Sequence, residues 1–217
     1  MHEAACDMLD SIPMNQAVFL KPPPHGHIAN WLGPEMVQRL LDFVQEQRDS
    51  FFPSGVGYGE NSRIDANVRR SGRITDLGDL KQELRPRIRA VLPTVLRQLG
   101  AEAFEPGRIE LEMVARGDGA FFTEHKDIAV EDNKFGVRRI ITAVYYFHRL
   151  PKAFSGGVLP IYPLAGSKNS TAFVDIEPTN DALVFFPAWF PHEVLPVACP
   201  SGRFEDSRFA INCWIHR

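Results

Sequence analysis

Three side chains in the second half of the chain have the types and spacing of a metal site. His125 and Asp127 are two residues apart. Such positions point to the same face of an extended chain, so one strand can present both to a single ion. His192 would supply a third ligand from another strand. Two imidazoles and one carboxylate leave coordination positions open, which suits non-haem Fe(II) and oxygen chemistry. The set contains no thiolate, which disfavours a structural zinc site.

Arg208 adds a permanent positive charge to this set. It precedes the apolar residues Phe209, Ala210 and Ile211, where a buried charge is costly unless it meets an anion. A hairpin centred near residue 200 would place Arg208 opposite His192, and their even separation would let both face the same side. A structural salt bridge to a protein carboxylate is the alternative interpretation of this arginine.

The first hundred residues are expected to contain two amphipathic helices. Apolar side chains recur at helical spacing over residues 34–48 and 79–99. Pro34 suits the first position of the first helix. Pro86 and Pro93 predict a kink in the second helix or its break into two. Gly100 is expected to end it.

The segments around these helices are interpreted as short strands and loops. A short strand is expected at residues 17–20, followed by a solvated loop that contains His25 and His27. Residues 68–75 carry three arginines (Arg69, Arg70 and Arg73) and are interpreted as a solvated edge or hairpin. Binding of an acidic substrate group by these arginines is the alternative.

From residue 108 onward the apolar period changes to two, which is typical of half-buried strands. Further strands are expected at residues 138–147, 155–162, 171–176, 181–186, 192–197 and 207–216. Closely spaced strands without intervening helices indicate an antiparallel sandwich or barrel. We expect a single domain over residues 1–217, in which 1–104 give helical and loop support and 105–217 form the catalytic core.

Residues 108–216 resemble the Fe(II)/2-oxoglutarate dioxygenases, specifically the prolyl-hydroxylase-like group. The resemblance rests on five segments in the family's order and approximate spacing, namely His125-Lys-Asp127, residues 139–146, Ser-Gly-Gly-Val-Leu-Pro-Ile-Tyr at 155–162, residues 192–197 and Arg208-Phe-Ala-Ile-Asn-Cys-Trp214. It implies a fold that is mainly β with flanking helices, in which a double-stranded β-helix (jelly-roll) core is braced by the two N-terminal helices.

The resemblance also implies roles for individual residues. His125, Asp127 and His192 would bind Fe(II). Arg208 would bind the distal carboxylate of 2-oxoglutarate. The remaining residues expected to contact this co-substrate or line its pocket are Tyr146, Thr142, Val144, Asn212 and Trp214. O2 would be the second co-substrate, and ascorbate is a further cofactor candidate.

The sequence also departs from the family pattern. A tyrosine that often precedes the turn before the His-x-Asp strand has no counterpart, since Ala115-Arg116 stands there. Collagen-type prolyl hydroxylases usually carry lysine where this chain has Arg208. Nucleobase demethylases of this class have a second arginine where this chain has Trp214. The presence of Asp127 favours hydroxylation over halogenation.

The predicted activity is hydroxylation of an unactivated C–H bond with decarboxylation of 2-oxoglutarate to succinate. A prolyl or other amino-acid side chain in a peptide or protein is one substrate class, and a free amino acid or small biosynthetic intermediate is the alternative. A more remote alternative to the enzymatic function is a non-catalytic jelly-roll protein that binds a metal or an anion. No protein general base is required, and Lys126 and Glu193 are expected to point away from the ligands.

The composition limits the partners and the location. A net charge of −3 argues against binding to nucleic acid or anionic membranes. Three cysteines without a CxxC pair fit a reducing compartment better than a disulfide framework. The first residues lack a basic, apolar signal peptide, and no apolar run approaches the roughly 20 residues of a membrane span. A cytoplasmic protein is therefore expected.

Overall fold

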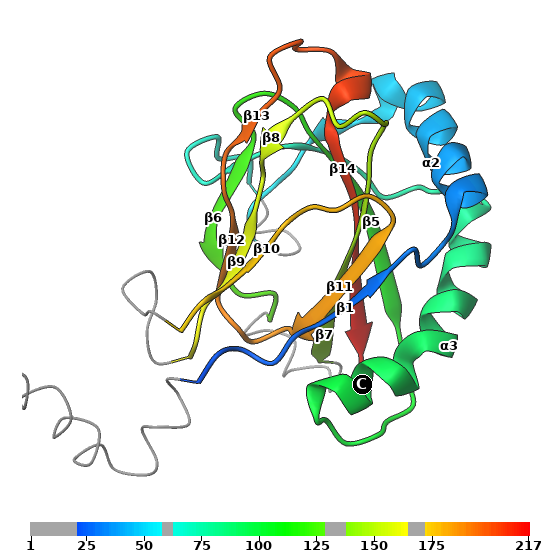
Figure 1. Cartoon of the computed structure of the whole chain (residues 1–217), viewed down its shortest axis with the longest axis vertical. Coiled ribbons are helices and arrows are strands. Elements are labelled where there is room, and N and C mark those ends of the chain that lie inside the picture. The colour runs from blue at the N-terminus through cyan, green and yellow to red at the C-terminus, as the bar shows by residue number, and fades with distance from the viewer. Residues whose placement is uncertain (1–20, 58–62, 129–137, 165–171) are drawn as a thin grey trace, which may run out of the picture.

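The structure is a computed structural model that describes residues 21–57, 63–128, 138–164 and 172–217. Its strands form two main sheets, and both helices lie on the outside of the larger sheet (Figure 1). In spatial order the larger sheet contains β1 (Gly26–Ala29), β11 (Ala182–Pro187), β7 (Arg139–Phe147), β14 (Arg208–His216), β5 (Ile109–Arg116), β4 (Gly72–Ile74) and β2 (Phe52–Pro53). The smaller sheet contains β10 (Val174–Ile176), β9 (Leu159–Ile161), β12 (His192–Val194), β6 (Phe121–His125) and β3 (Arg69–Arg70). The short strands β8 (Ser155–Gly156) and β13 (Val197–Ala198) form a separate pair.

Alternation along the central strands separates two faces of the larger sheet. In β14, Phe209, Ile211 and Cys213 face the helices and join the main hydrophobic core. Ala210, one residue out of step, joins the core between the sheets with Val144 and other side chains. Because side chains alternate along a strand, Arg208, Asn212 and Trp214 belong to this second face. The larger sheet therefore presents one apolar face to the helices and one mixed face to the smaller sheet.

The two helices match the predicted segments. α2 (Pro34–Glu46) begins at the predicted proline and is followed by the short helix η1 (Arg48–Ser50). It buries Leu40 completely against the main core. α3 (Leu80–Leu99) ends at Gly100, whose left-handed φ of 63° suits glycine.

The predicted break in the second helix is wrong, because α3 continues through both prolines. Pro86 and Pro93 lie on its exposed face. The carbonyl groups that they leave without a helical donor can bind water there.

The predicted hairpin between His192 and Arg208 is also wrong. His192 lies in the smaller sheet, opposite His125 and Ile161. Arg208 lies in the larger sheet, opposite Arg116. Between them the chain forms β13, which pairs with β8, and the short helix η4 (Phe204–Asp206). The nine-residue strand β14 is buried between β5 and β7, which gives its apolar side chains neighbours on both sides.

Several shorter segments also differ from expectation. Residues 68–75 contribute β3 to one sheet and β4 to the other, and Arg69 is buried, so this segment is not a solvated edge throughout. Residues 155–162 form two strands, β8 and β9. His27 belongs to β1, which pairs with β11, and is not in a loop. The predicted strand at 17–20 lies outside the described residues.

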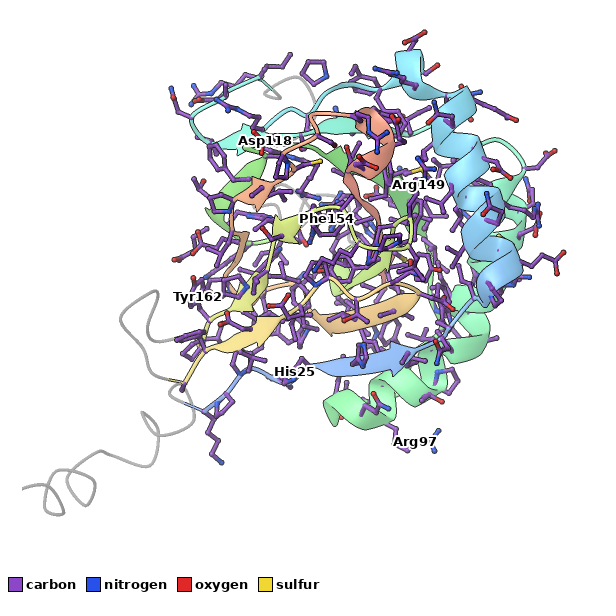
Figure 2. The ribbon with its side chains drawn as sticks, turned by 45° about the horizontal axis from the view of Figure 1, so that its top comes forward. His25, Arg97, Asp118, Arg149, Phe154 and Tyr162 are labelled. Carbon is purple, nitrogen blue, oxygen red and sulfur yellow. The ribbon has the colours of Figure 1, made fainter. Side chains whose placement is uncertain are left out.

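Figure 2 shows the two ends of the fold. His25 lies near the entry of β1, and Asp118 lies toward the opposite end, in the turn between β5 and β6. Asp118 accepts a hydrogen bond from the Cys199 backbone N–H at 2.8 Å, which ties this turn to the segment after β13. Within the described part of the chain, neither helix combines the length and apolar character that crossing a bilayer requires.

Candidate metal centre

Two residues of the smaller sheet and one residue just after its strand β6 form a compact group of potential metal ligands. His125 ends β6, Asp127 follows two residues later, and His192 begins β12. One ligand atom from each residue lies within 4.8 Å of the others. The antiparallel pairing of β6 with β12 places the two histidines directly opposite each other. The predicted ligands are thus brought together, although they are far apart in sequence.

Backbone carbonyls fix the orientation of both imidazole rings. His125 Nδ1 lies 2.8 Å from the Thr123 carbonyl, and His192 Nδ1 lies 3.0 Å from the Phe190 carbonyl. A carbonyl only accepts, so each Nδ1 carries a proton, and in the neutral ring the Nε2 presents a lone pair. These Nε2 atoms lie 3.8 Å and 3.4 Å from the carboxylate oxygens of Asp127. Such outer partners are typical of histidines that bind metals.

Asp127 is oriented by Thr142 on β7 of the facing sheet. Its Oδ2 accepts a hydrogen bond of 2.7 Å from the Thr142 hydroxyl. Both side chains are buried. Burial opposes ionisation of Asp127, but His192 and His125 outweigh it and hold the carboxyl pKa well below its usual range. The carboxylate is therefore ionised and available as a ligand.

His125 is held in the neutral form that binds metals. Burial, with a smaller contribution from His192, lowers the pKa of His125 to about 3. Neutral His125, an ionised Asp127 and a second imidazole form a donor set that suits a divalent first-row metal. The triad leaves one side of such an ion toward the space between the sheets.

This space is a cavity of about 690 Å³. Its lining includes the three potential ligands and five of the six residues predicted to contact the co-substrate or line its pocket, namely Thr142, Val144, Tyr146, Asn212 and Trp214. Arg208, the sixth, does not line it directly. Its guanidinium carbon lies 4.7 Å from the centre of the Tyr146 ring, and Tyr146 lines the cavity.

Comparisons with known proteins identify the family. The model of the 2OG-Fe(II) oxygenase superfamily matches residues 111–216. The chain is 35% identical over 207 residues to an uncharacterized PKHD-type hydroxylase from Synechocystis, with 94% of this chain and 66% of that protein covered.

The chain belongs to the 2OG-Fe(II) oxygenase superfamily.

Solved structures of this superfamily have the same fold. A prolyl-4-hydroxylase from Pseudomonas putida matches with a TM-score of 0.64 and 21% identity, covering 94% of this chain and all of that one. A prolyl hydroxylase from Trichoplax adhaerens was solved with a peptide fragment of hypoxia inducible factor. It matches with a TM-score of 0.65 and 20% identity, covering 99% of this chain and 94% of that one. The predicted double-stranded β-helix core with flanking helices is confirmed. The division of the chain into a support region and a core stays a prediction.

Fe(II), 2-oxoglutarate and O2 are the cofactor and co-substrates of this oxygenase superfamily, as predicted. The described residues fit these groups. The triad provides the imidazole and carboxylate donors of a non-haem iron site. Three nearby side chains have buried polar atoms that lack a hydrogen-bond partner among the described residues: Arg208 (Nε and Nη1), Tyr146 (Oη) and Arg116 (Nε). A carboxylate is the acceptor that such donors require.

Gly157 makes room for Arg208. A Cβ at this position would lie 2.6 Å from Arg208 Cδ, and the φ of 68° is itself unfavourable for other residues. The Ser-Gly-Gly segment identified in the sequence therefore packs directly against this arginine. Such close packing holds a buried cation in one orientation.

Sequence reasoning missed a second group of charges in the cavity. Glu112 on β5 is buried and accepts from Arg69 at 3.0 Å and from Arg73 at 2.9 Å. Asn212 reaches the same carboxylate at 3.4 Å. The strand had the alternation of a half-buried strand, but Glu110 and Glu112 line the cavity, and Glu112 binds arginines from β3 and β4.

Lys126 and Glu193 behave differently from each other. Lys126 is exposed and is among the residues that line the cavity, so its expected direction away from the ligands stays a prediction. Glu193 is buried and accepts a short hydrogen bond from the Tyr162 hydroxyl, outside the cavity lining. Burial, together with this hydrogen bond, raises the pKa of Tyr162 above its usual range.

Proposed function

We propose that this chain is an Fe(II)- and 2-oxoglutarate-dependent hydroxylase that acts on a prolyl or other amino-acid side chain in a peptide or protein. One observation supports this most directly. The oriented His-Asp-His group and a set of buried, unpartnered guanidinium and phenol donors lie around one cavity. A metal chelated by a 2-oxo acid would occupy the His-Asp-His group, and the distal carboxylate of that acid would give the unpartnered donors an acceptor.

In this proposal each residue has a defined task. His125, Asp127 and His192 hold Fe(II), and the carbonyls behind the two imidazoles keep their Nε2 atoms toward it. Thr142 keeps one oxygen of Asp127 engaged. Arg208, supported by Tyr146, binds the distal carboxylate of 2-oxoglutarate from the facing sheet. Asn212 and Trp214 line the cavity beside the co-substrate.

Bound Fe(II), 2-oxoglutarate and O2 together supply the oxidising power that hydroxylates an unactivated C–H bond. The balance is one substrate C–H, one 2-oxoglutarate and one O2 consumed, and one alcohol, one succinate and one CO2 formed. The protein contributes orientation and a largely buried site. No described residue needs to act as a general base, because the balance requires no net proton transfer.

The peptide substrate is supported by the relatives. The Synechocystis protein is named a PKHD-type hydroxylase, and the Trichoplax enzyme was solved with a peptide. The chain spans only 66% of the Synechocystis protein. Peptide hydroxylation by this chain is therefore proposed by similarity, together with a cytoplasmic location suggested by the sequence.

A second candidate is the same reaction on a small molecule that carries a carboxylate. Among the described residues, the cavity lining contains eight basic side chains and three acidic ones. The basic residues are Arg69, Arg73, Lys81, Arg85, Arg108, Arg116, Lys126 and Arg139, and the acidic ones are Glu110, Glu112 and Asp127. This excess of positive charge favours an anionic molecule near the site.

Succinate formation tests the proposal. Protein with Fe(II), 2-oxoglutarate and O2 is screened against proline-containing peptides and, in parallel, against free amino acids and other small carboxylates. We expect substrate-stimulated succinate release that is lost in His125→Ala and Asp127→Ala. His27→Ala is the matched control, because His27 is exposed on β1 outside the cavity.

The two candidate substrates and the non-catalytic alternative give different outcomes. Hydroxylated peptide supports the proposal, and hydroxylation of small carboxylates alone supports the second candidate. A protein that binds Fe(II) but releases no succinate with any substrate, or without one, would be a metal-binding jelly-roll protein and would refute both.

A further inference from the structure

Arg116 is a second buried arginine at the end of the cavity where Arg208 lies. It is the last residue of β5 and pairs with Arg208, the first residue of β14, across the two antiparallel strands. Residues paired in this way have neighbouring side chains on one face of the sheet. Arg116 is only 3% exposed and lines the cavity. Arg116 therefore lines the cavity at the end where Arg208 lies behind Tyr146.

Arg69, another buried arginine that lines the cavity, has a carboxylate partner, whereas Arg116 does not. Arg69 binds Glu112, which also binds Arg73. For Arg116 no hydrogen bond or ion pair occurs with any residue that the structure describes, and its Nε is fully buried without an acceptor. Glu112 is already shared by two arginines and Asn212. Arg116 therefore makes no ion pair within the described chain, although the charge of Glu112 acts favourably on it.

Two neighbouring buried guanidinium groups without an anion are unfavourable. Burial lowers the pKa of Arg116 well below its usual range, and the charges of Arg208 and Arg69 lower it further. Arginine keeps its proton in proteins, so the unfavourable energy is present whenever the cavity holds only water. An anion that binds both groups would remove much of it.

We propose that Arg116 binds the distal carboxylate of the 2-oxo acid co-substrate together with Arg208 and Tyr146. This inference rests on the proposed function and adds a residue to it. Tyr146 has a buried hydroxyl without a partner and lies against Arg208. The carboxylate would then accept from two guanidinium groups and one phenol, so the site selects 2-oxo acids that have a second carboxylate.

The geometry assigns Arg116 to the distal end of the co-substrate. Arg208 and Arg116 form the first pair of the β14–β5 ladder, whereas Trp214 and Glu110 are paired near its other end. Thr142, which contacts the metal ligand Asp127, pairs with Trp214 across β7 and β14. The metal therefore lies toward the Trp214 end of β14, and the two arginines lie toward the opposite end.

Ligand binding without turnover tests this assignment. The protein is loaded with Fe(II) under anaerobic conditions and titrated with 2-oxoglutarate or with pyruvate by calorimetry. Pyruvate has the same chelating 2-oxo carboxylate but lacks the distal one. Because charged hydrogen bonds are the strong ones, we expect Arg116→Gln to weaken 2-oxoglutarate binding about 10- to 100-fold. Its affinity for pyruvate should stay within about threefold of the wild type, since a threefold change is below 1 kcal/mol.

Arg73→Gln is the matched control. Arg73 also lines the cavity, but it is paired with Glu112. Its removal lowers the positive charge of the cavity by the same amount and should change 2-oxoglutarate affinity less than Arg116→Gln does. An equal loss of 2-oxoglutarate affinity in both variants would show that only the total positive charge of the cavity matters, and it would overturn the assignment. Equal loss of 2-oxoglutarate and pyruvate in Arg116→Gln would overturn it as well.

Thermal unfolding separates ligand binding from a structural role. Without ligand, Arg116→Gln should melt at or above the wild-type temperature, because it removes an unpaired buried charge. The rise in melting temperature on adding 2-oxoglutarate should be smaller than in the wild type. A variant that melts well below the wild type and keeps the full ligand-induced rise would make Arg116 a structural residue.

The outcome for the wild type distinguishes this inference from the proposed function. If wild-type protein binds Fe(II) but not 2-oxoglutarate, the proposed function fails and the role of Arg116 fails with it. If the wild type binds 2-oxoglutarate, Arg208→Gln loses it and Arg116→Gln retains it fully, only the role of Arg116 is refuted.

Discussion

Thr142→Val removes the hydrogen bond that orients the metal-binding carboxylate. Thr142 Oγ1 donates to Asp127 Oδ2 at 2.7 Å, and Thr142 is 2% exposed and Asp127 6%. Valine has nearly the same shape, so the variant replaces a donor with a methyl group and creates no large cavity. Water has little access to take the place of the lost donor.

The expected loss can be worked from this contact. A hydrogen bond to a charged group contributes about 1.5–3 kcal/mol, and a buried acceptor left without its donor loses that stabilisation. Loss of an outer partner of a metal ligand typically costs about 10- to 100-fold in metal affinity, which is about 1.4–2.8 kcal/mol. The two estimates agree. We therefore expect Thr142→Val to bind Fe(II) about 10- to 100-fold more weakly.

Competition with a coloured chelator under anaerobic conditions measures this affinity. Thr142→Ser should retain most of it, because the hydroxyl is kept. Thr123→Val is the matched control, since the Thr123 carbonyl, and not its side chain, binds His125, and we expect an affinity within about twofold of the wild type, a difference of less than 1 kcal/mol. Wild-type affinity in Thr142→Val, or equal loss in both valine variants, would refute this account of how Asp127 is held.

Three further variants test other parts of the structure. Gly157→Ala should weaken 2-oxoglutarate binding in a calorimetric titration, because the added Cβ would lie 2.6 Å from Arg208 Cδ. Gly202→Ala is the control, since Gly202 has a similar φ of 62° and no atom near its added Cβ. This control should lower the stability of the protein but leave its affinity for 2-oxoglutarate unchanged. Leu40→Ala should lower the free energy of unfolding in urea by about 2–5 kcal/mol, since this fully buried side chain anchors α2; a loss below 1 kcal/mol would contradict that role. Burial opposes ionisation of Glu110, but His216 and two arginines outweigh it and lower the pKa of Glu110 from 4.5 to about 2. Its ionised form therefore stabilises the fold fully above about pH 4.5, and this contribution, about 1–3 kcal/mol after allowance for partial exposure, is lost as the pH falls toward 2. The difference in unfolding free energy between wild type and Glu110→Gln should shrink over that range, and a constant difference would contradict the prediction.

The metal ligands could be predicted because their signal is local. His125 and Asp127 occupy alternate positions of one extended segment, and period two alone predicts a shared face. His192 was added by the chemistry of the donor set and by the family resemblance. The structure brings all three together through the pairing of β6 with β12.

The surroundings of Arg208 could not be predicted by local reasoning. A hairpin with the preceding strand was the simplest arrangement, but β14 pairs with β5 and β7, far away in sequence. That pairing also places Arg116 beside Arg208. In the sequence Arg116 precedes a glycine-rich turn, where an exposed arginine is the ordinary expectation, so its burial was missed.

Glu112 was missed for a similar reason. Alternating glutamates and apolar residues are typical of a strand with one solvated face. Here the face that carries the glutamates is covered by the smaller sheet, and arginines from β3 and β4 neutralise it. Alternation reports that two faces differ, but it does not report whether the polar face meets water or a charged cavity.

Anaerobic titration of the Fe(II)-loaded protein with 2-oxoglutarate tests the central claim most directly. Fe(II) chelated by a 2-oxo acid gives a weak visible charge-transfer band. The wild type should develop this band and saturate at one 2-oxoglutarate per chain, and His192→Ala should not develop it. Wild-type protein that binds Fe(II) but never shows the band would contradict the assignment of this cavity as the site of both iron and co-substrate.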